Sequence, residues 1–186
     1  MPTPVTYENY YGDIYYLIRK KTKKGNWRYY FAKSKKGKLT YSIPDGYEID
    51  EKPDGKVYLI KEIPQFISEQ EKALVENSVE KYSEVEYFRV YVKKEKLTIN
   101  LAQDSVKSLK KTIGHLYDEN KFRKFLTFTP MLQFVLVDKT NRIFEVRRYC
   151  FRGAIDDWIF LDEGNLKEMA KQYCKYLGKE SFYDLI

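Results

Sequence analysis

Residues 13–33 read DIYYLIRKKTKKGNWRYYFAK, two apolar and aromatic runs on either side of a lysine-rich segment. The runs Asp13–Arg19 and Trp27–Lys33 are rich in the aromatic and β-branched residues that favour strands. The segment between them carries four lysines and the pair Gly25-Asn26, which is typical of a turn. The sequence therefore predicts an antiparallel hairpin with a cationic tip.

The residues that follow extend this β structure. Pro53-Asp54-Gly55 separates two short runs, Tyr47–Asp50 and Val57–Ile60, and predicts a second hairpin. Ile63-Pro64 then marks a joint, because proline disfavours the helical conformation in the residue before it. We expect residues 1–63 to form a small, basic, β-rich N-terminal unit.

Helical and strand patterns alternate after this joint. Ser68 and Glu71 have the spacing of a capping box, and a last helix carries an apolar stripe from Leu166 to Leu177 before Gly178. Between them the pattern predicts helices from Asp104 and over residues 119–126, and strands over residues 85–92, 97–101, 132–137, 142–149 and 158–161. We therefore predict the α+β class: a small N-terminal antiparallel β unit, then helices packed on an antiparallel sheet in residues 64–186. The two units could also form one compact domain.

The positive charge of the chain is concentrated near its N-terminus. Up to Thr40 there are ten Lys and Arg residues against two acids, whereas the net charge of the whole chain is +7. Nine of the 18 tyrosines also lie at or before Tyr47. Clustered cations attract phosphates, and aromatic rings stack on bases.

This combination predicts a non-catalytic accessory protein that binds DNA or RNA through its tyrosine-rich N-terminal hairpin. Arg28 and Tyr30 share the strand face opposite Trp27 and Phe31, so we expect them to face the bases. The expected nucleic-acid-binding residues are Lys20, Lys21, Lys23, Lys24, Arg28, Tyr30, Lys33, Lys35 and Lys36.

Two other interpretations of the hairpin stay open. Its lysines can form a solvated edge that blocks aggregation between strands, while its aromatic residues pack inside. Alternatively, the tyrosines can form the contact surface of a protein-interaction module whose partner is another protein or a second copy of this chain.

The sequence also bears on the cellular compartment. No apolar run is long enough to cross a bilayer, and Met1–Pro4 lacks the pattern of a secretory signal. Cys150 and Cys174 are too few for a disulfide framework, and we expect both to be reduced. The sequence thus predicts a cytoplasmic protein without a membrane partner.

The acidic residues are candidates for catalysis, and the case for them is weaker than the case for the basic hairpin. Asp156-Asp157 and Asp162-Glu163 could hold Mg²⁺, but adjacent aspartates on a strand point to opposite faces. Asp138 and Glu145-Val146-Arg147 are ordered as in a metal-dependent nuclease, but their spacing is short and Arg stands in place of Lys, so we favour a turn and a salt bridge. His115, the single histidine, cannot form the usual zinc tetrad with two cysteines. We expect no metal and no cofactor, and we favour a protein that is not an enzyme.

Three motifs stand out along the chain. They are YYGDIYYL at Tyr10–Leu17, IPDGYEI at Ile43–Ile49 and YCFRGAIDDW at Tyr149–Trp158. Together they resemble an uncharacterised family of prokaryotic hypothetical proteins over most of the chain. Because that family has no assigned activity, the resemblance implies no substrate, cofactor or catalytic residue.

Overall fold

The structure is a computed structural model that describes residues 2–103, 110–112, 114, 118, 122–152 and 155–186, with side chains except at 152, 155 and 156. By its contacts the chain divides into two compact units. The first comprises Met1–Ile63 with Ile113–Leu126, and the second comprises Pro64–Thr112 with Thr127–Ile186. That residues 1–63 and 64–186 are separate domains stays a prediction.

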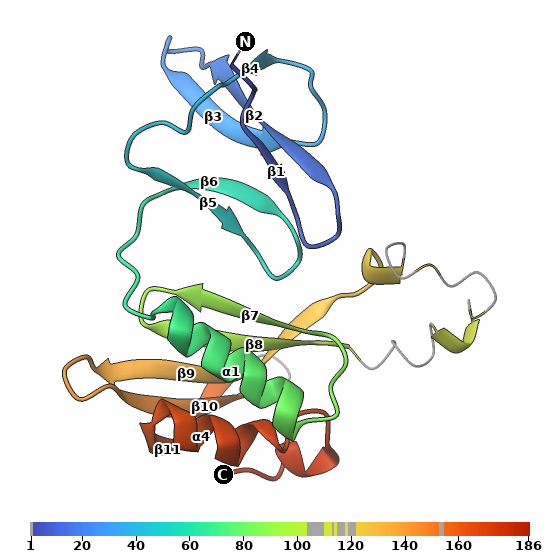
Figure 1. The fold of residues 1–186 in the computed structure, drawn as a ribbon, viewed down its shortest axis with the longest axis vertical. Coiled ribbons are helices and arrows are strands. Elements are labelled where there is room, and N and C mark those ends of the chain that lie inside the picture. The colour runs from blue at the N-terminus through green and yellow to red at the C-terminus, as the bar shows by residue number, and fades with distance from the viewer. Residues whose placement is uncertain (1, 104–109, 113, 115–117, 119–121, 153–154) are drawn as a thin grey trace. The chain divides into compact units, whose positions relative to one another are not determined.

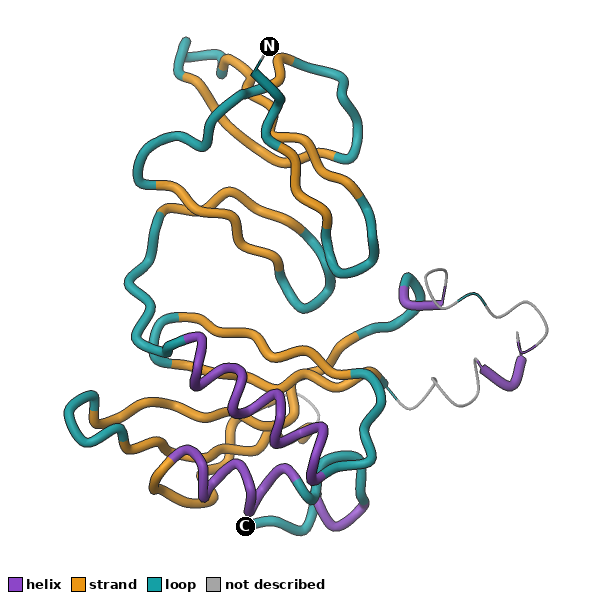
Figure 2. Tube along the Cα trace, viewed as in Figure 1, coloured by secondary structure: helices purple, strands orange, loops and turns teal. Residues whose placement is uncertain are grey.

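Strands dominate both units (Figures 1 and 2). They hold 43% of the described residues, in three antiparallel sheets, and helices hold 19%. The expected α+β class, with helices packed on an antiparallel sheet, is therefore wrong, and the fold is mostly β. One cause is that the last strand, β11, spans Ile155–Asn165, where the pattern predicts a strand over residues 158–161 alone. The helices predicted from Asp104 and over residues 119–126 lie largely outside the described residues.

The first unit contains a four-stranded sheet with β2 at its centre. β3 pairs with one edge of β2, and β1 and β4 pair one after the other along its second edge, which confirms the predicted hairpin. Leu17 and Ile18 are both buried although they point to opposite faces, so other residues cover both faces of β2 at this point. The strands are β1 (Thr6–Glu8), β2 (Ile14–Lys21), β3 (Trp27–Ala32) and β4 (Lys38–Leu39).

A second hairpin completes the described strands of this unit. β5 (Tyr47–Glu51) and β6 (Val57–Lys61) pair with each other as predicted, and β6 contacts β3. Asn9, which follows β1, donates a hydrogen bond from Nδ2 to the Gly55 carbonyl in the β5–β6 turn at 2.7 Å. Among the described residues of the first unit, the buried hydrophobic ones are Leu17, Ile18, Val57, Phe122 and Leu126.

The second unit contains a five-stranded antiparallel meander in the order β11-β10-β9-β8-β7. Alternation along β8 sends Leu97 and Ile99 into the hydrophobic core and Thr98 to the other face. The strands are β7 (Phe88–Lys93), β8 (Lys96–Ala102), β9 (Phe128–Asp138), β10 (Ile143–Arg152) and β11 (Ile155–Asn165).

Two helices flank this meander in the sequence, α1 (Glu69–Tyr82) before it and α4 (Leu166–Cys174) after it. They contact each other, and Val79 and Ala170 share one buried cluster with Phe144. The predicted capping box opens α1, Asn165 caps α4, and a short 3-10 helix, η2, follows at Glu180–Phe182. None of the described helices is both long enough and apolar enough to span a membrane.

Candidate nucleic-acid interface

The tip of the β2–β3 hairpin has two distinct faces. Its turn, Thr22–Asn26, is closed by a hydrogen bond from its first N–H to its last carbonyl at 2.8 Å. This turn places Lys21 directly opposite Trp27, and Lys20 opposite Arg28. Because opposite residues of an antiparallel pair lie on one face of a sheet, Trp27 and Arg28 mark opposite faces of the tip.

Three cations surround the ring of Trp27. Measured to the ring centroid, Arg19 Cζ lies at 4.8 Å, Lys21 Nζ at 5.4 Å and Lys38 Nζ at 5.7 Å. The register explains this, because Arg19 pairs with Tyr29 on β3 and with Lys38 on β4, which puts all three cations on the Trp27 face. We call these four residues, Arg19, Lys21, Trp27 and Lys38, the Trp27 cluster.

The Trp27 cluster carries positive charge that no acid balances. Within the part of the chain that the structure describes, no carboxylate forms an ion pair with Arg19, Lys21 or Lys38. Arg19 Nε is buried and has no hydrogen-bond partner among the described residues. Each exposed cation–π contact contributes only about 0.5–1 kcal/mol, and the three like charges repel one another. An anion at this face would supply the missing negative charge.

The expected binding residues do not all meet at one point. Tyr30 is half-buried opposite Ile18, so it is not an open surface for a base. Lys35 lies over the ring of Tyr16, at 5.0 Å from Nζ to the ring centroid. Of the expected binding residues, those exposed at or near the tip are Lys20, Lys21, Lys23, Lys24 and Arg28, and those exposed in the next loop are Lys33, Lys35 and Lys36.

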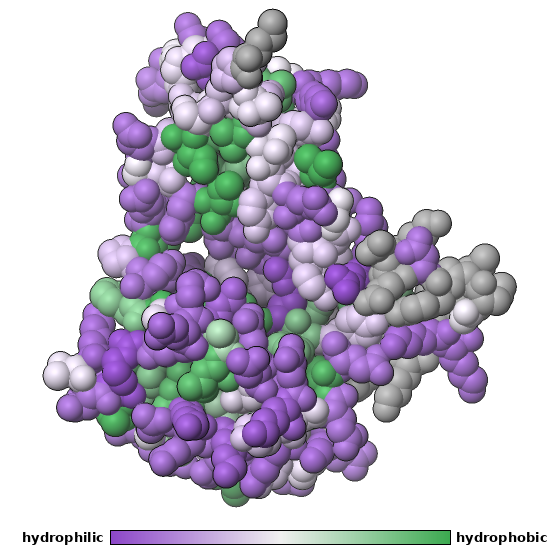
Figure 3. Space-filling model, in the orientation of Figure 1, coloured by the Kyte–Doolittle hydropathy of each residue, from purple (hydrophilic) through white to green (hydrophobic). Residues whose placement is uncertain are grey.

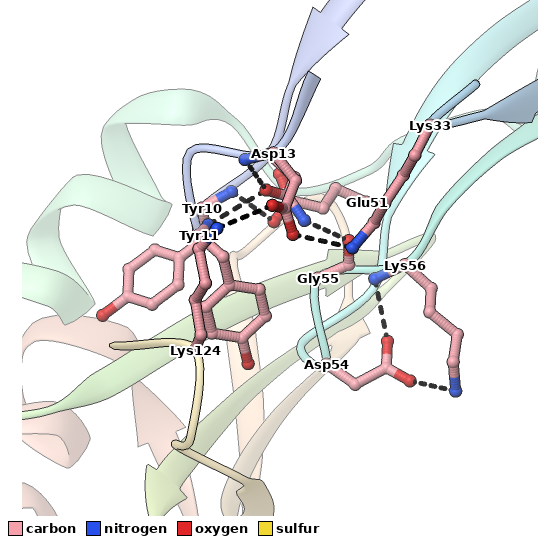
Figure 4. A network of polar contacts seen from close by, with 10 residues as sticks. Tyr10, Tyr11, Asp13, Lys33, Glu51, Asp54, Gly55, Lys56 and Lys124 are labelled. Atoms are coloured by element: carbon pink, nitrogen blue, oxygen red, sulfur yellow. Dashed lines mark hydrogen bonds and ion pairs between the residues drawn. The ribbon is translucent and has the colours of Figure 1, made fainter. Parts of the chain in front are cut away.

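Lys33 differs from the other expected residues because it has a carboxylate partner. Its Nζ lies 2.7 Å from Asp13 Oδ2, and Lys124 Nζ lies 2.9 Å from Asp13 Oδ1 (Figure 4). Hydrogen bonds from both lysines lower the pKa of Asp13, and the bond to Asp13 raises the pKa of Lys33. Lys33 therefore contributes less free charge to the basic surface than the tip lysines do.

Most tyrosines of the first unit take part in packing. The Tyr7 hydroxyl donates to Glu51 Oε2, and the Tyr11 hydroxyl donates to the Leu126 carbonyl, both at 3.0 Å. The more exposed tyrosines are Tyr41, Tyr47 and Tyr58, which lie outside the β2–β3 hairpin. Figure 3 shows hydrophobic side chains, in green, gathered on one face of this unit among hydrophilic ones.

The acidic residues considered for catalysis have local partners. Asp138 accepts hydrogen bonds from the N–H groups of Thr140 and Asn141, which is the pattern of a turn, and these bonds lower its pKa. Glu145 pairs with Arg147. No group of three His, Cys, Asp or Glu residues that could hold a metal ion occurs among the described residues.

Asp162 and several arginines near these acids also have local partners or lie outside the described residues. Asp162 accepts from the Tyr173 hydroxyl at 3.0 Å. Arg142 pairs with Glu71, and Arg148 donates to the Leu185 carbonyl. His115 and the side chains of Arg152 and Asp156 lie outside the described part.

Sequence reasoning missed three members of the Trp27 cluster: Arg19, Trp27 and Lys38. Alternation along β3 groups Trp27 with Tyr29 and Phe31, which suggests an inward face, yet Trp27 is 42% exposed. One available signal was turn length, because a turn at Thr22–Asn26 pairs Lys21 with Trp27 and so brings Arg19 onto the same face. Lys38 had no such signal, because its place beside β2 depends on the path of the intervening chain.

Comparison of the chain with protein-family models, with curated proteins and with solved structures finds no match. The resemblance to an uncharacterised prokaryotic family therefore stays an expectation from the three motifs.

Proposed function

We propose that this protein binds nucleic acid without catalysis, through the basic tip of the β2–β3 hairpin. The observation that carries the proposal is the uncompensated charge of this tip. In the described structure, Lys20, Lys21, Lys23, Lys24 and Arg28 are exposed and have no carboxylate partner.

Phosphate is the anion that such a surface fits best. A nucleic acid offers a row of phosphates, and binding to cations releases the counterions condensed around them. The logarithm of affinity should then fall linearly with the logarithm of salt concentration, by about 0.7 to 0.9 for each phosphate contact. A single small anion would produce a much shallower dependence.

Fluorescence anisotropy of labelled DNA and RNA across a salt series tests this proposal. We would compare wild type with a tip variant in which Lys20, Lys21, Lys23 and Lys24 are changed to Ala. The matched control removes the same charge from exposed lysines of the second unit, namely Lys93, Lys96, Lys167 and Lys171.

The tip variant should bind more weakly and with a shallower salt slope, and the control should stay close to wild type. Equal losses in both variants would show that net charge alone is responsible. Flat anisotropy at low salt for every nucleic acid would overturn the proposal.

A protein-interaction module is the second candidate, supported by exposed residues outside the hairpin tip. Tyr41, Tyr58, Tyr47 and Ile43 are 56%, 45%, 36% and 36% exposed. Tyrosine is enriched where proteins meet, since its ring buries much area with few rotatable bonds. This candidate predicts self-association or a co-purifying partner that withstands salt, and light scattering after size-exclusion chromatography at low and high salt would detect self-association.

A further inference from the structure

We infer that the nucleic acid is single-stranded, with one base stacked on Trp27 and its neighbouring phosphates held by Arg19, Lys21 and Lys38. This inference rests on the proposed function and specifies its ligand.

The first support is the exposure of an indole among cations. Trp27, the first residue of β3, is 42% exposed, although tryptophan normally buries its ring. An exposed indole offers a single N–H donor and a flat π surface, on which a base would take the place of one of the cations that lie over the ring. That donor cannot read the varied donor and acceptor patterns on base-pair edges, whereas the ring can stack on any base. Base faces are hidden within a duplex and open in a single strand.

The second support is the arrangement of charge around the ring. The nearest charged groups lie at 4.8 Å, 5.4 Å and 5.7 Å from the ring centroid. A nucleotide has a matching arrangement, because a single sugar joins its flat base to its charged phosphate. A base on Trp27 would thus bring its phosphates near these cations, and charge-assisted contacts from them could hold the phosphates.

The third support is that β2 and β3 do not form a free ribbon. β4 pairs with Ile18 and Arg19 on the second edge of β2, so only the pairs Lys20–Arg28 and Lys21–Trp27 extend beyond it. A two-stranded ribbon that enters a major groove must project from the body of the protein. The Trp27 cluster lies instead on a sheet face, the surface on which single strands are commonly bound.

The test compares an oligothymidine with an abasic oligonucleotide of the same length, which keeps the phosphates and lacks the bases. Binding is followed by anisotropy, and by tryptophan fluorescence in a Trp158→Phe background, where Trp27 is the one remaining tryptophan. We expect oligothymidine, but not the abasic strand, to quench the fluorescence of Trp27. The affinity for oligothymidine should be about 5- to 150-fold above that for the abasic strand. A duplex presenting the same number of phosphates should bind more weakly than oligothymidine.

The Trp27→Ala variant should lose most of the preference for oligothymidine while keeping its affinity for the abasic strand and its salt slope. Trp27→Phe, which retains a ring, should restore part of the preference, and far-UV circular dichroism checks that both variants fold. Equal binding of oligothymidine and the abasic strand, or tighter binding of duplex, would overturn this inference and leave the proposed function standing. Absence of salt-dependent binding to all three ligands would overturn the proposed function itself.

Discussion

Gly55 shows how one residue can set the packing of the first unit. It lies in the β5–β6 turn with a φ of +73°, and an added Cβ would lie 2.2 Å from Tyr11 Cε2. Tyr11 in turn donates its hydroxyl to the Leu126 carbonyl. A side chain at position 55 would therefore strain the backbone and displace Tyr11.

Gly55→Ala should destabilise the first unit by about 2–4 kcal/mol, from left-handed backbone strain together with overpacking. Gly46→Ala is the matched control, because Gly46 has the same φ of +73° and nothing within 4 Å of its added Cβ. Gly46→Ala should lower the free energy of unfolding by only about 1–2 kcal/mol. Urea unfolding followed by circular dichroism gives both values, and equal costs would show that contact with Tyr11 is unimportant.

Cys174 is the second residue with a sharp expectation. Burial raises the pKa of its thiol to about 12, and the thiolate is the form that reacts. In a Cys150→Ser variant, Cys174 should react very slowly with a disulfide reagent at pH 8 and rapidly once guanidinium unfolds the chain. Release of the coloured thiolate measures both rates, and immediate labelling of the folded protein would contradict the burial.

At the scale of elements, the start of α1 joins a helix cap to a distant turn. Glu71 accepts from the N–H and hydroxyl of Ser68 in the capping box and pairs with Arg142 from the β9–β10 turn. Burial tends to raise the pKa of Glu71, but the hydrogen bonds from Arg142 and Ser68 outweigh it and hold that pKa below the usual value.

Because the folded-state pKa of Glu71 is lowered, its contribution to stability is present above the unfolded value near 4.5 and is lost as pH falls through the folded value. Glu71→Gln should therefore lower the free energy of unfolding by about 1–3 kcal/mol at pH 7 and by less at pH 3. Urea unfolding followed by Trp158 fluorescence in a Trp27→Phe background measures the difference. Glu69→Gln, in the same helical turn, is the control and should have a small effect. An equal cost of Glu71→Gln at both pH values would exclude this linkage.

At the scale of the whole molecule, the two units bury cores of unequal size. The first buries five hydrophobic residues among those described, Leu17, Ile18, Val57, Phe122 and Leu126. The second buries a much larger cluster, from Ile67 to Phe182. Stability rises with buried apolar area, at about 25 cal/mol per Å².

We therefore expect the first unit to open at a lower free energy than the second. Native-state hydrogen exchange with mass spectrometry should show faster exchange of the amides in β2 than of those in β9. If the units open separately, mild urea should increase the difference in exchange rate between the amides of β2 and those of β9. Identical opening free energies in both strands would instead indicate one cooperative unit.

Local features of this protein could be predicted from its sequence because they depend on neighbouring residues. The lysine-rich turn before Trp27, the Pro53-Asp54-Gly55 turn and the Ser68 cap all act within a few residues, and each occurs where its pattern predicts. The basic tip of the first hairpin follows from composition and turn position alone. The sequence thus predicts the first two hairpins, the start of α1 and the location of the positive charge.

Tertiary structure decided the balance of strand over helix and which aromatic rings stay exposed. β11 extends over Ile155–Asn165 because it pairs along the length of β10, a partner that its own residues do not specify. Alternation groups Trp27 with Phe31 on one face, but it cannot show how far along that face other chain segments cover it. Lys38 reaches Trp27 only because β4 pairs with β2. These outcomes depend on contacts between distant residues, and no local pattern encodes such contacts.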